Sequence, residues 1–437
     1  MDLFAERMNL IGTENAFKVG AEITKAEALA PGLKVVRLNI GEPDFDSPEV
    51  VNQAGIESIK KGNTHYGPPQ GTPAFREAVA GQILRSRGIT VNPNFVVPTA
   101  GAKPGIGFSL LAYVNPGDEV IYPSPGYPMY ESWVRFVGAK PVPMTLQESN
   151  GFRMEASLLE KLITPKTKLI FICSPSNPTG GVLSEKQLRE ISEVIRKKCS
   201  ENVRIFSDEI YEHIVFDGNK HISIASFPEM LSRTIISSGH SKSYAMTGWR
   251  LGYHILPSQR ETETFNTLNI NTISCLPPFV LEAGREALAN AKAIDPLLKK
   301  MVASFEERRN YVVDALNAIS GIHCTKPGGA FYVFPNVSEV VESLGIIKDY
   351  EKLPLEIQKK SSPATLLQRF ALFKHGVATI DRRSFGTIGS EGQHYLRLST
   401  ATSMDLLKEG LKRLKTSTED KNGWKAFFKE GKGSELV

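Results

Sequence analysis

Apolar runs that alternate with helical patterns are the feature that most constrains how this 437-residue chain can fold. Four short apolar runs bounded by turn residues are typical of buried strands, at residues 119–122, 168–173, 203–207 and 234–238. Helical periodicity marks three stretches between or after them, at residues 126–137, 184–198 and 281–291. The alternation predicts crossover units, and hence an α/β fold with a mainly parallel sheet and helices on both faces.

A second, smaller unit is predicted from the last third of the chain. A long helical stretch at residues 292–318 leads into it, and two strand-like runs and a closing helix follow, at residues 331–334, 395–399 and 403–414. Residues 337–365 are polar and charged, which predicts a helical insertion or a surface loop. The tail at residues 416–437 is rich in Lys, Glu and Gly and predicts a peripheral extension.

Composition excludes several classes of protein. The net charge of +5 is spread along the chain, which favours anionic small ligands over nucleic acid. No stretch approaches the roughly twenty apolar residues of a membrane-spanning helix, so we expect no membrane partner. The four cysteines form no Cys-x-x-Cys pair or zinc-type spacing, which predicts no metal site. The same cysteines and the acidic N-terminus together predict a cytoplasmic protein.

Lys242 and Arg250 are the first candidates for catalytic or ligand-binding residues. An amine that can lose its proton can bond an aldehyde, and a nearby cation both lowers its pKa and can clamp a phosphate. Small residues surround the pair, at Gly239, Ala245 and Gly248, so a loop can close tightly around a planar ligand there. Either charge taken alone has a simpler interpretation as a solvated surface group.

The whole run from Gly239 to Gly252 resembles the lysine signature of class I pyridoxal-phosphate aminotransferases. The likeness includes Gly-Trp-Arg-Leu-Gly at residues 248–252 and departs at His240, where the family usually has an apolar or aromatic residue. We interpret His240 as a packed or partly solvated histidine. Matched motifs follow in order over about residues 13–415, which implies the fold of the type I pyridoxal-phosphate enzymes.

The resemblance implies a domain division as well. An N-terminal arm with part of the small domain would occupy residues 1–47, and a large cofactor domain with a mainly parallel central sheet residues 48–300. The rest of a small α+β domain, built from both chain ends, would occupy residues 301–437.

Partners for the pyridine ring of pyridoxal phosphate lie just past two predicted strands. The ring nitrogen needs a carboxylate, and Asp208 matches the family's pyridine-binding aspartate. Tyr211 and Asn177 match the donors to the phenolic oxygen, and the Asn177 amide would also touch the substrate carboxylate. Tyr127 matches the aromatic ring that stacks on the pyridine face. The alternatives are that Asp208 caps a helix and that both tyrosines pack in the core.

A phosphate site is predicted where a strand-like run opens into an apolar helix, because the first amides of a helix bind anions. The family's phosphate contacts match Gly101, Ala102 and Lys103. Gly105 and Gly107 do not indicate a dinucleotide site, since the third glycine of that fingerprint is missing.

The resemblance also assigns contacts to the substrate and to a second subunit. Arg397, in an apolar strand-like run, matches the arginine that binds the substrate α-carboxylate, and a guanidinium fork suits that group. Gly41 matches the glycine whose backbone approaches the substrate. Tyr66 matches a tyrosine that reaches the cofactor phosphate of the neighbouring subunit, which implies a homodimer with shared active sites.

Lys103 is the main indication of substrate choice. It resembles the lysine with which one branch of aspartate aminotransferases binds a distal carboxylate, and residues 12–15 could donate further bonds. Alternatively, Lys103 contributes only its backbone to the phosphate site. Arg382 and Arg383 stand where the family often has Pro-Gly, and they could favour an acidic substrate or face solvent.

The leading hypothesis is an aminotransferase that moves an amino group from an L-amino acid, aspartate or another acidic or broad-range donor, to a 2-oxo acid such as 2-oxoglutarate. Aromatic or broad specificity is the nearest variant. A lyase that removes a β- or γ-substituent, including a C–S lyase, can use the same fold and cofactor. A ligand-sensing domain is disfavoured because no DNA-binding segment is evident.

Overall fold

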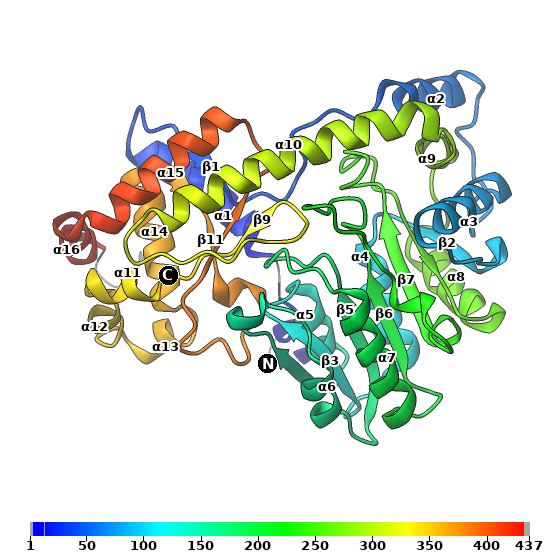
Figure 1. Ribbon diagram of the computed structural model, residues 1–437, viewed down its shortest axis with the longest axis horizontal. Coiled ribbons are helices and arrows are strands. Elements are labelled where there is room, and N and C mark those ends of the chain that lie inside the picture. Colours follow the sequence, from blue (N-terminus) through cyan, green and yellow to red (C-terminus); the bar gives the residue numbers. More distant parts are fainter. Residues whose placement is uncertain (1–2, 13, 432–437) are drawn as a thin grey trace.

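A seven-stranded sheet forms the centre of the larger part of the computed structural model, which describes residues 3–12 and 14–431 (Figure 1). The strand order is β2-β8-β7-β6-β5-β3-β4, and β8 runs antiparallel to both of its neighbours. The strands are β2 (Val96–Thr99), β3 (Glu119–Ser124), β4 (Lys140–Thr145), β5 (Thr167–Cys173), β6 (Arg204–Asp208), β7 (Thr234–Gly239) and β8 (Gly252–Ile255). The four strands and the mainly parallel sheet predicted from the sequence are confirmed.

Helices cover both faces of this sheet because alternate residues of its strands point to opposite sides. In β5, Ile170 and Ile172 pack in one apolar cluster, whereas Leu169 and Phe171 pack in another. The first cluster includes residues of α6 and α7, and the second includes residues of α4, α5 and α8. The helices of this part are α2 (Glu49–Lys60), α3 (Pro73–Arg87), α4 (Lys103–Tyr113), α5 (Met129–Phe136), α6 (Ala156–Leu162), α7 (Glu185–Lys198), α8 (Gln259–Ile273) and α9 (Pro278–Ala289).

Local sequence explains where α7 begins and which face it buries. Ser184 and Gln187 form a capping box, in which the Ser184 hydroxyl accepts from the Gln187 amide. Leu188, Ile191 and Ile195 follow at helical spacing and are all buried. The predicted helix at residues 184–198 is therefore confirmed to within one residue.

The carboxyl ends of β5, β6 and β7 lie side by side. Cys173 is paired with Asp208, and Asp208 with Ser237, so the three parallel strands end in register. The loops that follow them carry Asn177, Tyr211 and Lys242. In a parallel sheet the open ends of the strands and the loops beyond them form the usual ligand-binding edge.

Segments from both chain ends build a second, smaller group of strands. β1 (Val36–Arg37) pairs in parallel with β10 (Val377–Ala378), and β12 (Leu396–Ser399) lies between β11 (Ile380–Asp381) and β9 (Tyr332–Val333). The long helix α10 (Ala291–Asn317) crosses from α9 to this group (Figure 1), as its predicted counterpart does. The surrounding helices are α1 (Asn15–Leu29), α11 (Ser338–Ser343), α12 (Ile346–Tyr350), α13 (Leu355–Gln358), α14 (Pro363–His375), α15 (Met404–Glu419) and α16 (Lys421–Glu430).

The C-terminal tail differs from its prediction. The closing helix α15 continues to Glu419, and α16 follows as a separate helix whose Trp424 is fully buried. The Trp424 ring packs against Phe370 of α14, and its Nε1 donates to Asp349 Oδ2 at 3.0 Å. The expected peripheral extension is therefore wrong for residues 416–431, because the apolar side of α16 belongs to the core. Residues 432–437 lie outside the described residues.

The segment at residues 337–365 is helical over most of its length, and it is a packed part of the fold. Val340 and Val341 of α11 are buried in the same cluster as Trp424. None of the helices formed by residues 3–12 and 14–431 combines the length and apolar character needed to cross a membrane.

Replacing Trp424 by alanine is expected to lower the free energy of unfolding by about 3–5 kcal/mol, because it removes a fully buried ring and a hydrogen bond to Asp349. Urea unfolding followed by circular dichroism measures the change. Lys425→Ala, at an exposed position of the same helix, is the control and should change stability by less than about 0.5 kcal/mol. Equal stability of the two variants would show that α16 does not belong to the core.

Candidate active site

A cavity of about 650 Å³ lies at the carboxyl edge of the large sheet, against the smaller group of strands. Residues from the large sheet, from the loops after its strands and from the N-terminal and C-terminal segments all line it. Ten of the candidate site residues predicted from the sequence are among them: Gly41, Ala102, Lys103, Tyr127, Asn177, Asp208, Tyr211, Lys242, Arg250 and Arg397. Tertiary structure thus brings together residues that are up to 356 positions apart, Gly41 and Arg397.

Lys242 presents its amine to this cavity. The Lys242 Nζ donates to the carbonyl oxygen of Gly41 at 2.6 Å. Removal from water lowers the pKa of this amine to about 8, an effect that the Arg397 and Arg250 charges reinforce and that Glu42 and Glu14 oppose. Near neutral pH a sizeable fraction of the Lys242 amine is therefore neutral and nucleophilic.

Asp208 places a carboxylate at the end of β6 without a cationic partner. Its Oδ2 accepts from the Tyr130 hydroxyl at 2.6 Å, and no Lys, Arg or His among residues 3–12 and 14–431 forms an ion pair with it. Burial raises the pKa of Asp208 to about 6, against the opposing effect of the Tyr130 hydrogen bond. Asp208 is partly buried, and a carboxylate that is largely removed from water without a counter-ion suits a ligand that brings a positive charge.

Arg397 places a buried positive charge, its guanidinium, in the same cavity. Its Nη1 donates to Asn177 Oδ1 at 3.1 Å and its Nη2 to the Asn39 carbonyl oxygen at 2.5 Å. The planar group lies 4.4 Å from the ring centre of Tyr332 and 5.0 Å from that of Phe385. Within the described part of the chain Arg397 has no carboxylate partner, and its Nε has no hydrogen bond. The fork is thus held in place to receive an anion.

A pair of tyrosines joins the two sheets beside this guanidinium. The hydroxyl groups of Tyr211 and Tyr332 are 2.7 Å apart and hydrogen-bonded, and burial raises the pKa of both. A Cβ atom at Gly41 would lie 2.0 Å from the Tyr332 Oη, so only glycine at position 41 leaves room for the Tyr332 hydroxyl. Sequence reasoning missed Tyr332, although it predicted the strand on which this tyrosine lies.

The loop between β2 and α4 provides an anion site. Gly101 has a φ of +83°, which favours glycine, and α4 begins at Lys103, so the amides of Ala102 and Lys103 lie at the helix start, where backbone N–H groups can bind an anion. The exposed guanidinium of Arg250 donates to the carbonyl oxygen of Thr247 at 2.9 Å and to that of Ala100 at 3.4 Å. A Cβ atom at Gly101 would lie 2.5 Å from the Arg250 Nη2, so glycine also lets the arginine approach the loop. These donors fit a phosphate group.

Lys103 has a partner that the sequence did not indicate. Its Nζ forms an ion pair with Glu14, whose Oε1 also accepts from the Tyr127 hydroxyl at 2.7 Å. The expectation that residues 12–15 donate bonds to a substrate needs correction, because the Glu14 side chain is an acceptor and already occupies Lys103. Thr13 lies outside the described residues.

Other residues singled out in the sequence lie away from the cavity. Tyr66 is 90% exposed and does not line it. His240 is fully buried and its Nε2 lies 3.1 Å from the Gly284 carbonyl oxygen, while burial lowers its pKa to about 4. Arg382 is fully buried as well, and donates to Ser124, Gln393 and Gly386. The expectation that Arg382 faces solvent or a substrate is therefore wrong.

The fold and the cavity together define a class of protein. A lysine of lowered pKa, a partly buried carboxylate that lacks a cation, and an anion site at a helix start match the aldehyde, the pyridine nitrogen and the phosphate of pyridoxal phosphate. Such a combination on a mainly parallel sheet is that of a pyridoxal-phosphate-dependent enzyme.

Comparison with known proteins places the chain within that class: it belongs to the class I and II aminotransferases, whose family model matches residues 34–414. It is 35% identical to an aspartate aminotransferase of Pyrococcus abyssi, over 92% of this chain and 96% of that protein. It is also 35% identical to aromatic-amino-acid aminotransferase 2 of Thermococcus litoralis, over 92% of this chain and 96% of that protein. The crystal structure of the aspartate aminotransferase from Rhizobium meliloti matches with a TM-score of 0.84, at 33% identity, over 96% of this chain and 99% of that one.

The chain is therefore an aminotransferase that uses pyridoxal phosphate and acts on amino acids and 2-oxo acids. The expected family, fold, reaction class and cofactor are confirmed.

In the cofactor-free protein, the Lys242 amine is expected to react with acetic anhydride at a rate that reaches half of its maximum near pH 8. Reactivity rises with pH because only the neutral amine is nucleophilic. Ordinary lysines reach half of their maximal rate at about pH 10.4. Trace labelling followed by peptide mass spectrometry gives the rate for each lysine. A midpoint above pH 10 for Lys242 would contradict the lowered pKa.

Proposed function

We propose that this aminotransferase takes its amino group from an acidic amino acid of the aspartate type and passes it to 2-oxoglutarate. The observation that carries the proposal is that one cavity holds two cationic side chains besides Lys242 and Arg250, namely Arg397 from β12 and Lys103 from α4. A dicarboxylic substrate offers one carboxylate to each. Relatives named as aspartate aminotransferases support the same assignment.

Each side chain of the cavity has a separate task in this proposal. When bound, pyridoxal phosphate supplies an electron sink that acidifies the α-proton of the amino acid. Lys242 Nζ takes that proton, and a pKa near 8 suits an amine that both accepts and returns a proton near neutral pH. Arg397 and Asn177 hold the α-carboxylate, so that the α-carbon faces Lys242.

The remaining cavity residues would hold the cofactor itself. Asp208 would keep a positive charge on the ring nitrogen, and Tyr211 and Asn177 would donate to the phenolic oxygen. The Tyr127 ring would cover one face of the pyridine. The backbone of Gly101, Ala102 and Lys103 and the Arg250 guanidinium would bind the phosphate. Support for this set is their common position around one cavity, with Gly101 directly against Arg250.

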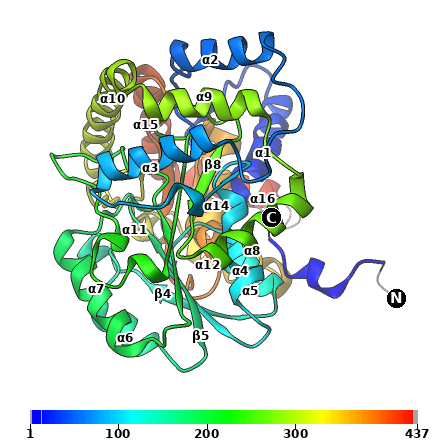
Figure 2. The ribbon, with the colours of Figure 1, turned by 90° about the vertical axis from the view of Figure 1, so that its right-hand side faces the viewer.

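A homodimer with shared active sites is part of the proposal. Tyr66 is 90% exposed, as expected of a residue that contacts the cofactor phosphate of a second subunit. The N-terminal segment projects from the body of the molecule (Figure 2), and its Leu3 is 88% exposed. Apolar side chains on a projecting segment favour contact with a second copy.

We also propose the domain division at residues 47/48 and 300/301, and a cytoplasmic location. The separate strand groups support two domains, and the second boundary falls within α10. All four cysteines are free thiols, which suits a reducing compartment.

Aromatic or broad specificity is the second candidate, and the Glu14 side chain favours it. In the ion pair, the Glu14 carboxylate balances the positive charge of the Lys103 ammonium, which is then less able to attract a distal carboxylate. Substrates without that carboxylate would not need to displace Glu14. Relatives with an aromatic-amino-acid name show that both specificities occur among similar chains.

A panel of amino acids tests the proposed reaction. The cofactor-loaded protein is expected to form oxaloacetate from aspartate only in the presence of 2-oxoglutarate, with glutamate as the stoichiometric second product. Coupled assays of oxaloacetate and of ammonia measure the outcome, with phenylalanine and cysteine as comparison substrates. Faster turnover of phenylalanine than of aspartate would favour the aromatic alternative. Ammonia or sulfide release without 2-oxoglutarate would replace transamination by a lyase.

Substitutions at the ion pair separate the two specificities. Lys103→Ala is expected to raise the KM for aspartate by about tenfold and to leave that for phenylalanine nearly unchanged, because it removes one charged contact to the distal carboxylate. Glu14→Gln should act in the opposite direction and lower the KM for aspartate, since Lys103 then lacks its internal partner. Equal losses for both substrates in Lys103→Ala would indicate that this residue serves the phosphate instead.

A further inference from the structure

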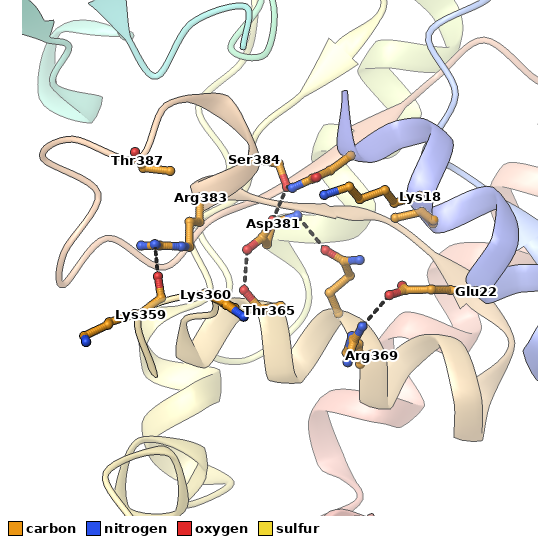
Figure 3. A pocket seen from close by; sticks show the side chains of 13 residues that line it. Lys18, Glu22, Lys359, Lys360, Thr365, Arg369, Asp381, Arg383, Ser384 and Thr387 are labelled. Carbon is orange, nitrogen blue, oxygen red and sulfur yellow. Dashed lines mark hydrogen bonds and ion pairs between the residues drawn. The ribbon is translucent and has the colours of Figure 1, made fainter. Parts of the chain in front are cut away.

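A second pocket, of about 490 Å³, lies outside the active-site cavity and shares no lining residue with it (Figure 3). α1 forms one wall and α14 another, and the short 3₁₀ helix η6 (Arg382–Phe385) and the turn at residues 359–360 complete it. Five of its lining residues are basic: Lys18, Lys359, Lys360, Arg369 and Arg383. Two are acidic, Glu22 and Asp381.

The two carboxylates of this basic pocket already have partners. Glu22 Oε1 accepts from Arg369 Nη2 at 2.5 Å. Asp381 is buried and accepts from the hydroxyl groups of Thr365 and Ser384. Among the described residues, neither carboxylate forms an ion pair with a lysine or with Arg383. Only Glu22 is charge-paired within the pocket, so the five basic and two acidic side chains leave an excess of positive charge there.

Three cations supply the positive charge, and the Asp381 carboxylate, whose side-chain partners are hydroxyl groups, lowers the excess to two charges. Lys18 and Lys360 are exposed, and Arg383 donates to the Lys359 carbonyl oxygen, a neutral acceptor. Within the described ranges none of the three has an ion pair with a carboxylate. Figure 3 shows Lys18 and Arg383 on opposite sides of Asp381, so the cations surround the pocket from different elements. Charges of one sign around a concave site concentrate counter-ions there.

We propose that the basic pocket binds a small oxyanion that carries at least two negative charges, either a phosphate compound or a di- or tricarboxylate. The Arg383 guanidinium would supply a planar fork and the Lys18 and Lys360 ammonium groups additional donors. No such site is needed for transamination, since the cofactor phosphate and the substrate carboxylates are bound in the other cavity. The bound anion is therefore an effector.

α1 contributes residues to both cavities, and η6 contacts Arg397 of the active site through Phe385, which gives the effector a route to the active site. Asn15 Nδ2 of α1 donates to Ser384 Oγ of η6 at 2.8 Å. The residues next to these two face the active site: Glu14 pairs with Lys103, and Phe385 packs on Arg397. An anion held between Lys18 and Arg383 ties α1 to η6 and holds Glu14 against Lys103. Bound effector should thus weaken the binding of a dicarboxylic substrate.

Isothermal titration calorimetry of the cofactor-loaded protein tests the site without any turnover. Pyrophosphate and citrate are titrated separately at constant ionic strength. Lys18→Gln and Arg383→Gln are each expected to weaken binding by about tenfold. Lys25→Gln removes the same charge from an exposed position of α1 outside the pocket, and should bind like the unchanged protein. Thermal unfolding verifies that all variants are folded.

The proposal is overturned if Lys18→Gln and Arg383→Gln bind both anions as tightly as the unchanged protein. It is also overturned if Lys25→Gln loses as much anion affinity as these two variants. Loss of binding in Lys103→Ala alone would also overturn it, because the anion would then lie in the active site. Tighter binding of pyrophosphate indicates a phosphate effector, and tighter binding of citrate a carboxylate one. Because calorimetry needs no substrate, these outcomes are independent of the proposed donor.

The proposed coupling between the basic pocket and the active site rests on the proposed function, and the KM for aspartate measures it. Saturating pyrophosphate is expected to raise the KM for aspartate by about fivefold in the unchanged protein and not in Lys18→Gln. Glu14→Gln should abolish the effect, since Glu14 carries it. An equal rise in the unchanged protein and in Lys18→Gln would show direct competition at the active site and refute the coupling.

Discussion

Two charged side chains without counter-ions in the described part of the chain, the partly buried Asp208 and the buried Arg397, are the constraint on which the active-site structure depends. Neither has an ion pair among the described residues, and each is held by neutral groups: a tyrosine hydroxyl for Asp208, and an amide, a carbonyl oxygen and two aromatic rings for Arg397. Burial without a counter-ion costs several kcal/mol per ion. The cost is offset when a cationic ring nitrogen and an anionic carboxylate enter the cavity, so the free protein is preorganised for its ligands.

Arg397 also connects the two parts of the fold. It lies on β12 of the smaller strand group, donates to Asn177 in the loop after β5, and packs on Phe385 of η6. Tyr332 of β9 adds a second link through its hydrogen bond to Tyr211. A shift of either strand group relative to the other therefore moves the carboxylate site. Pyridoxal-phosphate chemistry needs such precision, because the bond that breaks must stand perpendicular to the ring.

The sequence predicted the central sheet well and the periphery poorly, for a physical reason. β5 is an almost continuous apolar run, and β6 and β7 each carry a central apolar pair, because parallel strands are buried on both faces; such patterns are visible in the sequence. The tail is rich in charged residues, and only Trp424 and Phe427 show that it packs. The pairing of Glu14 with Lys103 and the role of Tyr332 were missed because they depend on contacts with Lys103 and Tyr211, which are 89 and 121 positions away.

The sequence by itself determined the reaction class, since the run around Lys242, the strand ending at Asp208 and the glycine-rich start of α4 are local patterns with a fixed chemistry. Only the tertiary structure decided which charges are paired. It joined Lys103 to Glu14, left Arg397 without a carboxylate among the described residues, and gathered Lys18 and Arg383 around a separate pocket. Pairing depends on distances between residues far apart in the chain, and those distances exist only once both strand groups have packed together.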